Sequence, residues 1–478
     1  MQISLPRIIQ GGMGAGVSNW RLAKAVSCLG ELGVVSGTAL DQILARRLQD
    51  GDPGGNVTRA LAHFPYPRMA QRILDALFVP GGKKEDAPYS SIGMHALEGR
   101  RWLQEICIAA NFVEVFLARE GHSNPVGINY LEKIQLPHLP SMYGAMLAGV
   151  AVVIVGAGIP TEIPAAMDAL ADHKAATYPI SVAGAPKGTS YLAKFNPDDF
   201  ADDRVAELEP LARPDFIPIV SSDTLACMLL RRAGGAVAGF VVEGNLAGGH
   251  NTPPRGKMQL TEEGEPIYGP RDIPNLEGVR KLGLPFWLAG SYGSPERLQD
   301  ALQAGAAGIQ VGTAFALCTE SGLDLTVRKA LVRKALEGEA SVFTDPYASP
   351  TGFPFKVARL EDSLSEMAVY GDRRRVCDLG FLREAYLKAD GTVGYRCPAE
   401  PESAYLAKGG KAEAMMGRKC LCNALMANIG LAQRLVSGGQ ERCLVTMGDD
   451  AVDIQRFCPH GTSEYSAADV VRVLLGSA

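Results

Sequence analysis

The chain has 478 residues, of which 47% are hydrophobic and 21% charged, an ordinary composition for a globular protein with a large core. Forty-seven lysines and arginines against 52 aspartates and glutamates give a formal net charge of −5, so there is no basic field to attract nucleic acid or anionic lipid. These numbers exclude a disordered chain, a collagen-like repeat and a small disulfide-stapled scaffold.

The N-terminal residues and the apolar runs give an expectation for location. The opening residues, MQISLPRIIQGG, lack an apolar stretch preceded by basic residues, so they do not resemble a secretory signal. The longest apolar run, 145–159, is interrupted by Gly149, Gly156 and Gly158 and is too short to span a bilayer. We therefore expect a cytoplasmic enzyme without a membrane contact, whose cysteines are reduced thiols or metal ligands.

Short apolar runs recur along the first two thirds of the chain and predict buried parallel strands. They lack strict alternation and are closed by Gly, Ser or Asn, as expected when helices cover both faces of a sheet. In chain order, the predicted strands are residues 7–10, 33–36, 126–131, 150–155, 217–220, 239–242, 286–289 and 308–311.

Amphipathic helical patterns lie between these runs. Ser18 or Asn19 caps the first, Asp223 the second, and Ser294 followed by Pro and Glu the third. The three helices are predicted at 19–32, 223–233 and 294–304. Strand–helix alternation indicates a parallel sheet, and about eight repeats indicate closure. The predicted fold is therefore an α/β (β/α)8 TIM barrel.

Two stretches do not fit the repeat. Residues from about 50 to 119 mix proline, glycine and charge with amphipathic helices at 68–78 and 96–118, and are predicted to be an insertion after the second strand. Residues 341–478 show no strand–helix rhythm and are predicted to form a helical and irregular subdomain packed on the barrel. The barrel domain, including the insertion, is expected to cover residues 1–340.

The loops after the predicted strands hold the candidate site, because function in such barrels lies at the carboxyl ends of the strands. Ala289-Gly290-Ser291 ends the seventh strand and Gly312-Thr313 the eighth; such small residues let backbone N–H groups approach a phosphate. Gln10–Gly14 follows the first strand, and its glycines let the backbone lie against a flat ring system. Tight or flexible turns are the alternative explanation at each place.

The loop after the sixth strand, Glu243-Gly244-Asn245-Leu246-Ala247-Gly248-Gly249-His250, has the strongest chemical content. An imidazole at the barrel mouth titrates near neutrality and can remove a proton from carbon. A single histidine is also often structural, so both roles remain open for His250 on this evidence alone.

Together these segments resemble the flavin-dependent family of nitronate monooxygenases (2-nitropropane dioxygenase-like) and type II enoyl-acyl-carrier-protein reductases, over roughly residues 1–340. Each motif is weak alone, but their order and spacing make the combination specific. The motifs are Ile8–Gly14, Gly127-Ile128-Asn129, Glu243-Gly244 with Ala247-Gly248-Gly249-His250, Leu288–Ser291 and Gly308–Thr313.

The resemblance implies that FMN binds in the barrel and that His250 is the catalytic base or acid. Ser291 departs from the family, which usually has a second glycine there, but should still donate to phosphate. The ring and ribityl end of the flavin would contact Gly12, Met13, Gly14 and Asn129, with Ser221 beside the flavin, and the ribityl–phosphate path would be lined by Gly248, Gly249, Ala289, Gly290, Ser291, Gly312 and Thr313.

The resemblance leaves two reactions open. The first is oxidation of a nitronate or similar small carbon acid over the flavin, with His250 as base. The second is NAD(P)H-dependent reduction of an enoyl thioester in fatty acid or polyketide synthesis, with an acyl carrier protein as partner. Segments 349–356 and 395–401 resemble the extended enoyl reductases of polyunsaturated fatty acid and polyketide synthases. A non-catalytic flavin-binding scaffold and a phosphosugar barrel are further alternatives for the function. The expected assembly is a homodimer or a complex with an acyl carrier protein.

Four cysteines of the tail lie within 46 residues, namely Cys377, Cys397, Cys420 and Cys422. Four thiolates suit zinc or an iron–sulfur cluster, but the spacing matches no standard zinc ribbon, and buried cysteines often pack as small hydrophobes. The family resemblance suggests a cluster beside the flavin, and with it a flavin/iron–sulfur enzyme acting on acyl thioesters. The other six cysteines, at 28, 107, 227, 318, 443 and 458, are expected in the core.

Overall fold

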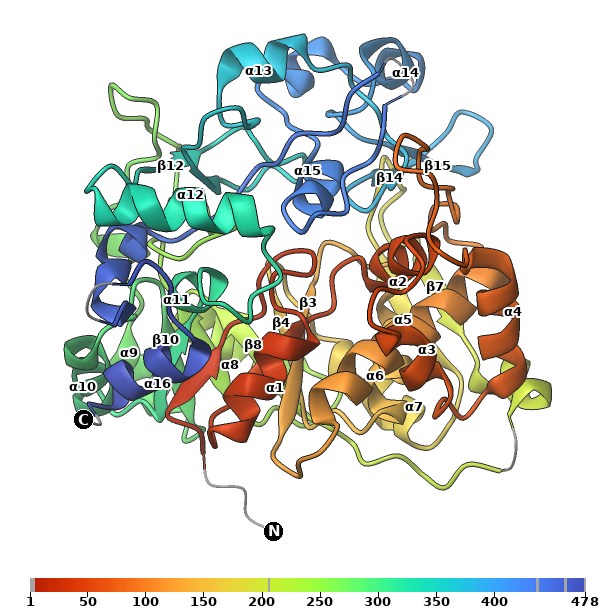
Figure 1. Ribbon diagram of the computed structural model, residues 1–478, viewed down its shortest axis with the longest axis horizontal. Coiled ribbons are helices and arrows are strands. Elements are labelled where there is room, and N and C mark those ends of the chain that lie inside the picture. The colour runs from red at the N-terminus through yellow and green to blue at the C-terminus, as the bar shows by residue number, and fades with distance from the viewer. Residues whose placement is uncertain (1–4, 205–206, 436–437, 460–461, 477–478) are drawn as a thin grey trace.

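Eight parallel strands form one closed sheet in the computed structural model, which describes residues 5–204, 207–435, 438–459 and 462–476 (Figure 1). The strand order is β1-β11-β10-β9-β8-β4-β3-β2. Gln10 N–H donates to Leu32 O at 2.9 Å and Leu32 N–H to Ile8 O at 3.1 Å, which joins β1 to the residue preceding β2. The strands are β1 Ile8–Gln10, β2 Gly33–Ser36, β3 Val126–Leu131, β4 Val152–Gly156, β8 Asp215–Val220, β9 Phe240–Glu243, β10 Phe286–Ala289 and β11 Gly308–Val311.

The TIM-barrel prediction is thus confirmed, and every predicted strand is present with its ends shifted by at most two residues. The interior of the barrel is filled by apolar side chains, among them Trp287, which is 1% exposed. Its indole N–H donates to the Pro6 carbonyl at 2.8 Å. The first four residues of the N-terminal segment lie outside the described part of the chain.

The predicted barrel helices form, with corrected ends. Helix α1 (Trp20–Cys28), capped by Asn19, stops four residues before the predicted end because Gly30 takes a φ of +86° and Leu32 joins the sheet. Helix α8 (Asp223–Arg232) is capped by Ser222, which accepts from Leu225 N–H at 3.2 Å, and not by Asp223 as predicted. Helix α10 (Pro295–Gln303) is capped by Ser294, as its Ser-Pro-Glu sequence predicts.

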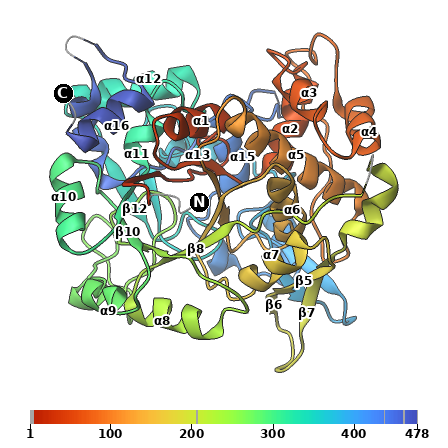
Figure 2. The same cartoon turned by 90° about the horizontal axis from the view of Figure 1, so that it is seen from below.

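The last described helix returns to the barrel. Helix α16 (Ala467–Leu475) packs against α1, α10 and the short helix α11 (Thr313–Ala316), beside the ring of barrel helices seen from below in Figure 2. The C-terminal end of the tail therefore joins the barrel's helical layer, while the domain boundary at residue 340 stays a prediction. The other helices of the ring are α6 His138–Leu147, α7 Ile163–Ala171 and α9 Leu276–Arg280, with the short η2 Pro270–Asp272 before α9. Helix α12 Leu325–Leu336 lies above the ring in Figure 1.

The segment after β2 is helical. It contains α2 Leu40–Gln49, α3 Asn56–Leu61, α4 Pro67–Leu77 and α5 Arg101–Arg119. Residues 96–100, predicted to be helical, are not. A charged network ties α4 and α5 to η1 (Pro197–Asp203): Arg72 contacts Glu105 at 2.7 Å and Asp203 at 2.8 Å, and Arg101 contacts Asp203 at 2.6 Å.

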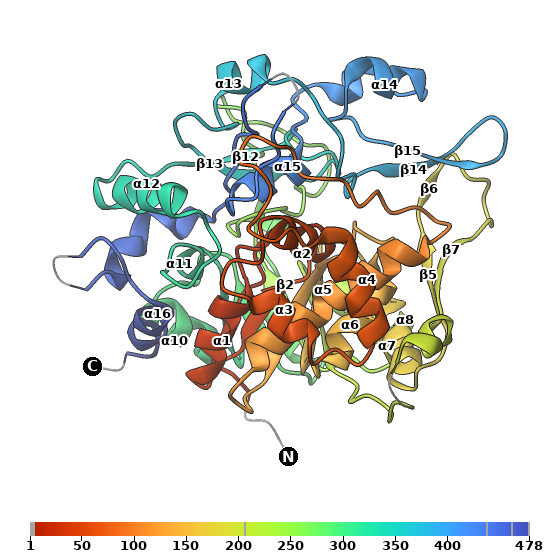
Figure 3. The same ribbon diagram turned by 45° about the vertical axis from the view of Figure 1, so that its right-hand side comes forward.

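Several strands outside the barrel were not predicted. One hairpin of β5 and β7 lies between α7 and β8, and the tail, expected to be helical and irregular, contains two further hairpins. The short strand β6 pairs with β14, which joins the barrel side of the chain to the tail (Figure 3). The strands are β5 Ala176–Ile180, β6 Val182–Ala183, β7 Tyr191–Phe195, β12 Val342–Asp345, β13 Phe355–Ala358, β14 Glu384–Leu387 and β15 Val393–Arg396.

Short helices complete the tail, the larger part of which lies above the barrel in Figures 1 and 3. They are α13 Met367–Asp372, α14 Glu402–Ala407, η3 Ala412–Met415, α15 Leu421–Ala427 and η4 Asp449–Phe457. Among the described residues, no helix is both long enough and apolar enough to cross a membrane.

Candidate functional site

A cavity of about 230 Å³ lies at the carboxyl ends of the barrel strands. Ser221, expected beside the flavin, is not among its lining residues, whereas Ile219 of β8 is. The other predicted cofactor and catalytic residues of the barrel all line the cavity, namely Gly12, Met13, Gly14, Asn129, Gly248, Gly249, His250, Ala289, Gly290, Ser291, Gly312 and Thr313.

The tail supplies the rest of the wall. Phe355, Leu421, Cys422 and Leu425 bring apolar groups and a thiol to the cavity, and 446–448 with Asp450 reach its other side. Two of these residues stand in segments that the sequence singles out: Phe355 lies within 349–356, and Cys422 is one of the four tail cysteines. Their place in the wall of this cavity has no local sequence pattern, because the tail follows the barrel in the chain.

The glycines of the lining keep the loops close together. A Cβ on Gly12 would lie 2.3 Å from the Asn129 Cβ, and one on Gly248 would lie 2.8 Å from the backbone of Met447. Gln310 lines the same cavity, and its Oε1 is buried without a hydrogen-bond partner among the described residues. Bare backbone beside an unpaired amide fits a flat ring with a polar edge, such as an isoalloxazine.

The two strand ends expected to bind phosphate lie side by side, since β10 pairs with β11. Gly290 has a φ of +94° and Ser291 a φ of +57°, which explains why a glycine is usual at position 291. Asp450 also lies here, where desolvation raises its pKa and a hydrogen bond from Thr313 lowers it. A protonated Asp450 can share this space with a phosphate, whereas an ionised one would repel it.

His250 is held by the tail. Its Nε2 lies 2.6 Å from Ser349 Oγ, which in turn lies 2.8 Å from Thr351 Oγ1. The Phe355 ring packs against the imidazole edge to face, with centroids 4.9 Å apart. Desolvation, followed by the charge of Lys133, lowers the pKa of His250 to about 4. The imidazole is therefore neutral near pH 7 and able to accept a proton.

Glu243 is a second titratable group of the cavity. Desolvation raises its pKa to about 8, so the carboxyl group is largely protonated at neutral pH. It belongs to the quoted motif, but the sequence assigned it no role because the shift depends on the loops that enclose it. Two titratable groups with pKa values displaced in opposite directions are typical of catalytic cavities.

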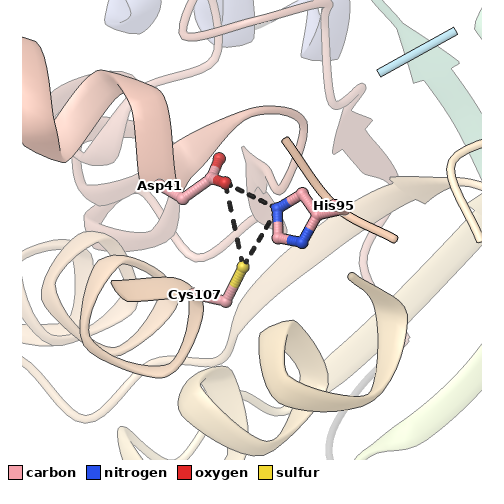
Figure 4. A group of neighbouring side chains, drawn as sticks. All are labelled: Asp41, His95 and Cys107. Carbon is pink, nitrogen blue, oxygen red and sulfur yellow. Dashed lines mark hydrogen bonds and ion pairs between the residues drawn. The ribbon is translucent and has the colours of Figure 1, made fainter. Parts of the chain in front are cut away.

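Another group of polar side chains lies beside the cavity, where Asp41, His95 and Cys107 point toward one another (Figure 4). His95 Nε2 is 2.8 Å from Asp41 Oδ2 and 3.7 Å from Cys107 Sγ. Because the same nitrogen faces both partners, the group cannot relay a proton from Cys107 through the ring to Asp41. Its contacts join α2, α5 and the segment between α4 and α5. Cys107 and Cys318 are buried as expected, whereas Cys28 is exposed.

Residues 193–346 match the family model described as nitronate monooxygenase. This segment is similar to the nitronate monooxygenases. It runs from β7 to β12 and contains His250, the loop at Ala289–Ser291 and the turn at Gly312-Thr313, so the family resemblance of the sequence is confirmed there.

A curated nitronate monooxygenase of Pseudomonas aeruginosa is 34% identical over 125 residues, which is 26% of this chain. The match spans about a third (34%) of that relative's length.

Several solved structures are similar to the chain over 99% of its length. FabK from Thermotoga maritima has 17% identity and a TM-score of 0.47 over 93% of its chain. Nitroalkane oxidase from Streptomyces ansochromogenes has 16% identity and a TM-score of 0.43 over 96% of its chain. The enoyl reductase domain of MlnA from the macrolactin cluster of Bacillus amyloliquefaciens has 11% identity and a TM-score of 0.47 over 94% of its chain. Each identity is too low to transfer a function to this chain.

The backbone at position 291 gives a stability prediction. A non-glycine residue at positive φ destabilises the folded state by about 1–2 kcal/mol. Glycine is free of this strain, but it loses about 0.5–1 kcal/mol more in chain entropy on folding. We expect Ser291→Gly to be about 1 kcal/mol more stable to unfolding than Ser291→Ala, measured by denaturant titration. Equal stability of the two variants would show that residue 291 is not held at positive φ.

Proposed function

We propose that the protein is an FMN-dependent oxidoreductase of the nitronate monooxygenase type, which oxidises a nitronate or a similar carbon acid. The observation that supports this most is the single cavity that gathers the family motifs around His250 at the carboxyl ends of the strands. The family match over 193–346 supports it independently.

The lining residues divide between the two ends of an FMN molecule. The backbone of Gly12–Gly14, Asn129 and the amide of Gln310 would hold the ring, and the loops after β9, β10 and β11 would hold the ribityl chain and phosphate. When bound, FMN supplies one- or two-electron transfer. The tail side chains Phe355 and Leu425 exclude water above this space, which strengthens polar interactions inside it.

His250 is positioned to take the substrate proton. Its pKa of about 4 keeps the imidazole neutral and unprotonated, and the hydrogen bond with Ser349 fixes the ring in the cavity wall. A carbon acid lying in the cavity can give its proton to this imidazole, while the protonated Glu243 adds no negative charge beside it.

Replacement of His250 tests this assignment. In His250→Asn we expect turnover of a carbon acid to fall by roughly 100- to 10,000-fold, while the FMN content per chain is unchanged, because the side chain removed handles the proton and does not hold the cofactor. Steady-state kinetics and flavin absorbance measure the two quantities. The exposed His63→Asn is the matched control, and unchanged turnover in His250→Asn would end the assignment.

The pH dependence gives a second test. Glu243, with a pKa of about 8, is protonated below that value and becomes negative above it, which disfavours electron-rich species in the cavity. We expect kcat to decrease as the pH rises through about 8, and this limb to be absent in Glu243→Gln. The pKa of His250, about 4, predicts no limb between about pH 5 and 7. A limb at pH 8 that persists in Glu243→Gln would contradict the assignment.

An enoyl-thioester reductase is the second candidate, and one observation favours it. A further cavity of about 240 Å³ adjoins the first, and the two share Ile134, Phe381 and Leu382. Lys133 and Arg383 line it, so an extended thioester arm that carries phosphate would meet two cations there.

The two candidates differ in what reduces the flavin and in what Lys133 does. For a reductase, anaerobic NADPH should bleach the flavin within a turnover time, and Lys133→Ala should raise KM for an acyl-CoA thioester by about tenfold or more through a lost charge-assisted contact. For a nitronate monooxygenase, a small nitronate should bleach the flavin, and Lys133→Ala should leave its KM unchanged. Bleaching by neither compound would contradict both candidates.

A further inference from the structure

Four cysteines from three separate segments of the tail meet at one small cavity, next to the proposed flavin site. Cys377 follows α13 and Cys397 follows β15, while Cys420 caps α15 and Cys422 lies in its first turn. None of the other six cysteines, all within the described residues, lines this cavity. The gathering is therefore specific to these four positions, although their spacing in the sequence matches no standard motif.

The four cysteines lie in one packed region of the tail. Cys397 and Cys420 are buried and the other two are partly buried. Cys397, Cys420 and Ala399 form one cluster of buried side chains, against which Cys422 packs. Three segments of the tail therefore bring thiols to one place, as a metal centre held by cysteine ligands requires.

Two arginines accompany the four cysteines. Arg383 lines the cavity that the cysteines share. Arg373 lies four residues before Cys377; its side chain is 4% exposed and pairs with Glu441 at 2.5 Å, and its Nη1 is buried without a hydrogen-bond partner among the described residues. A buried unpaired guanidinium donor is costly, and a thiolate-ligated anionic group would offset the positive charge of both side chains.

The separation of the sulfur atoms favours a cluster over a single zinc ion. Zinc–sulfur bonds of about 2.3 Å place tetrahedral thiolates about 3.8 Å apart. Within the described residues, the only three metal-ligating atoms found within 4.8 Å of one another are those of Asp41, His95 and Cys107, so no three of these four sulfurs come that close. An iron–sulfur cluster separates its ligands further, because inorganic sulfide and several iron atoms lie between them.

We propose that Cys377, Cys397, Cys420 and Cys422 ligate an iron–sulfur cluster. Cys422 also lines the flavin-side cavity, together with its neighbour Leu421 and with Leu382, so the cluster lies directly behind that wall. The proposal depends on the tail alone and does not rest on the reaction proposed above.

Anaerobic analysis of the full-length protein tests the proposal. We expect two or four iron atoms per chain with an equal amount of acid-labile sulfide, and an electron paramagnetic resonance signal after reduction with dithionite. Protein isolated without iron should regain the same ratio on anaerobic incubation with ferrous iron and sulfide. Less than one iron per chain both before and after this incubation, or one zinc without sulfide, would overturn the proposal.

Single substitutions locate the cluster. Cys377→Ala, Cys397→Ala, Cys420→Ala and Cys422→Ala should each lose at least about half of the iron and sulfide, because each removes one of four ligands. Cys443→Ala, at a tail cysteine outside the cavity, should keep both in full. Circular dichroism identifies any variant that fails to fold. For the position of such a variant, the wild-type protein is tested by alkylation instead: bound iron should protect the four thiols from iodoacetamide. Iron loss equal in Cys443→Ala, or no protection, would contradict the site.

Discussion

The loop after β9 is held in place by the tail, and the geometry of the whole cavity depends on this contact. Lys356 N–H donates to Gly249 O at 3.0 Å and Asn251 N–H to Pro354 O at 2.9 Å, so β13 continues into the barrel loop as an isolated antiparallel bridge at His250. Gly249 N–H donates to Thr446 Oγ1 at 2.7 Å. Backbone groups fixed from both sides leave the His250 ring few orientations, which is the precondition for proton transfer at a defined atom.

The same contact determines the electrostatics. With the tail above the strand ends, Glu243 and His250 are both partly buried, and desolvation drives each toward its neutral form: the pKa of Glu243 rises to about 8 and that of His250 falls to about 4. A barrel mouth open to solvent would leave both near their ordinary values. The same packing places Cys422 in the wall between the proposed flavin cavity and the cavity of the four cysteines.

The sequence predicted what is local and missed what is distant. Buried parallel strands are short apolar runs in the sequence, so all eight were predicted. The Ser-Pro-Glu sequence before α10 is typical of a helix start and of no other structure at this position. At α8, Ser222 and Asp223 are both good caps, and only the backbone decides between them. The contact of His250 with Ser349 joins residues 99 positions apart, and the roof of the cavity comes from the tail, so neither has a local signature. The gathering of the four tail cysteines, likewise, is a property of the folded chain.

The central claim is that the enclosed cavity at the strand ends is a flavin site. The visible absorption spectrum of the purified protein, before and after incubation with FMN and removal of the excess, tests it most directly. The account predicts flavin bands near about 370 and 450 nm at one FMN per chain after incubation, with the cofactor's fluorescence altered by the closed wall. A folded protein that remains colourless and retains no FMN would contradict it.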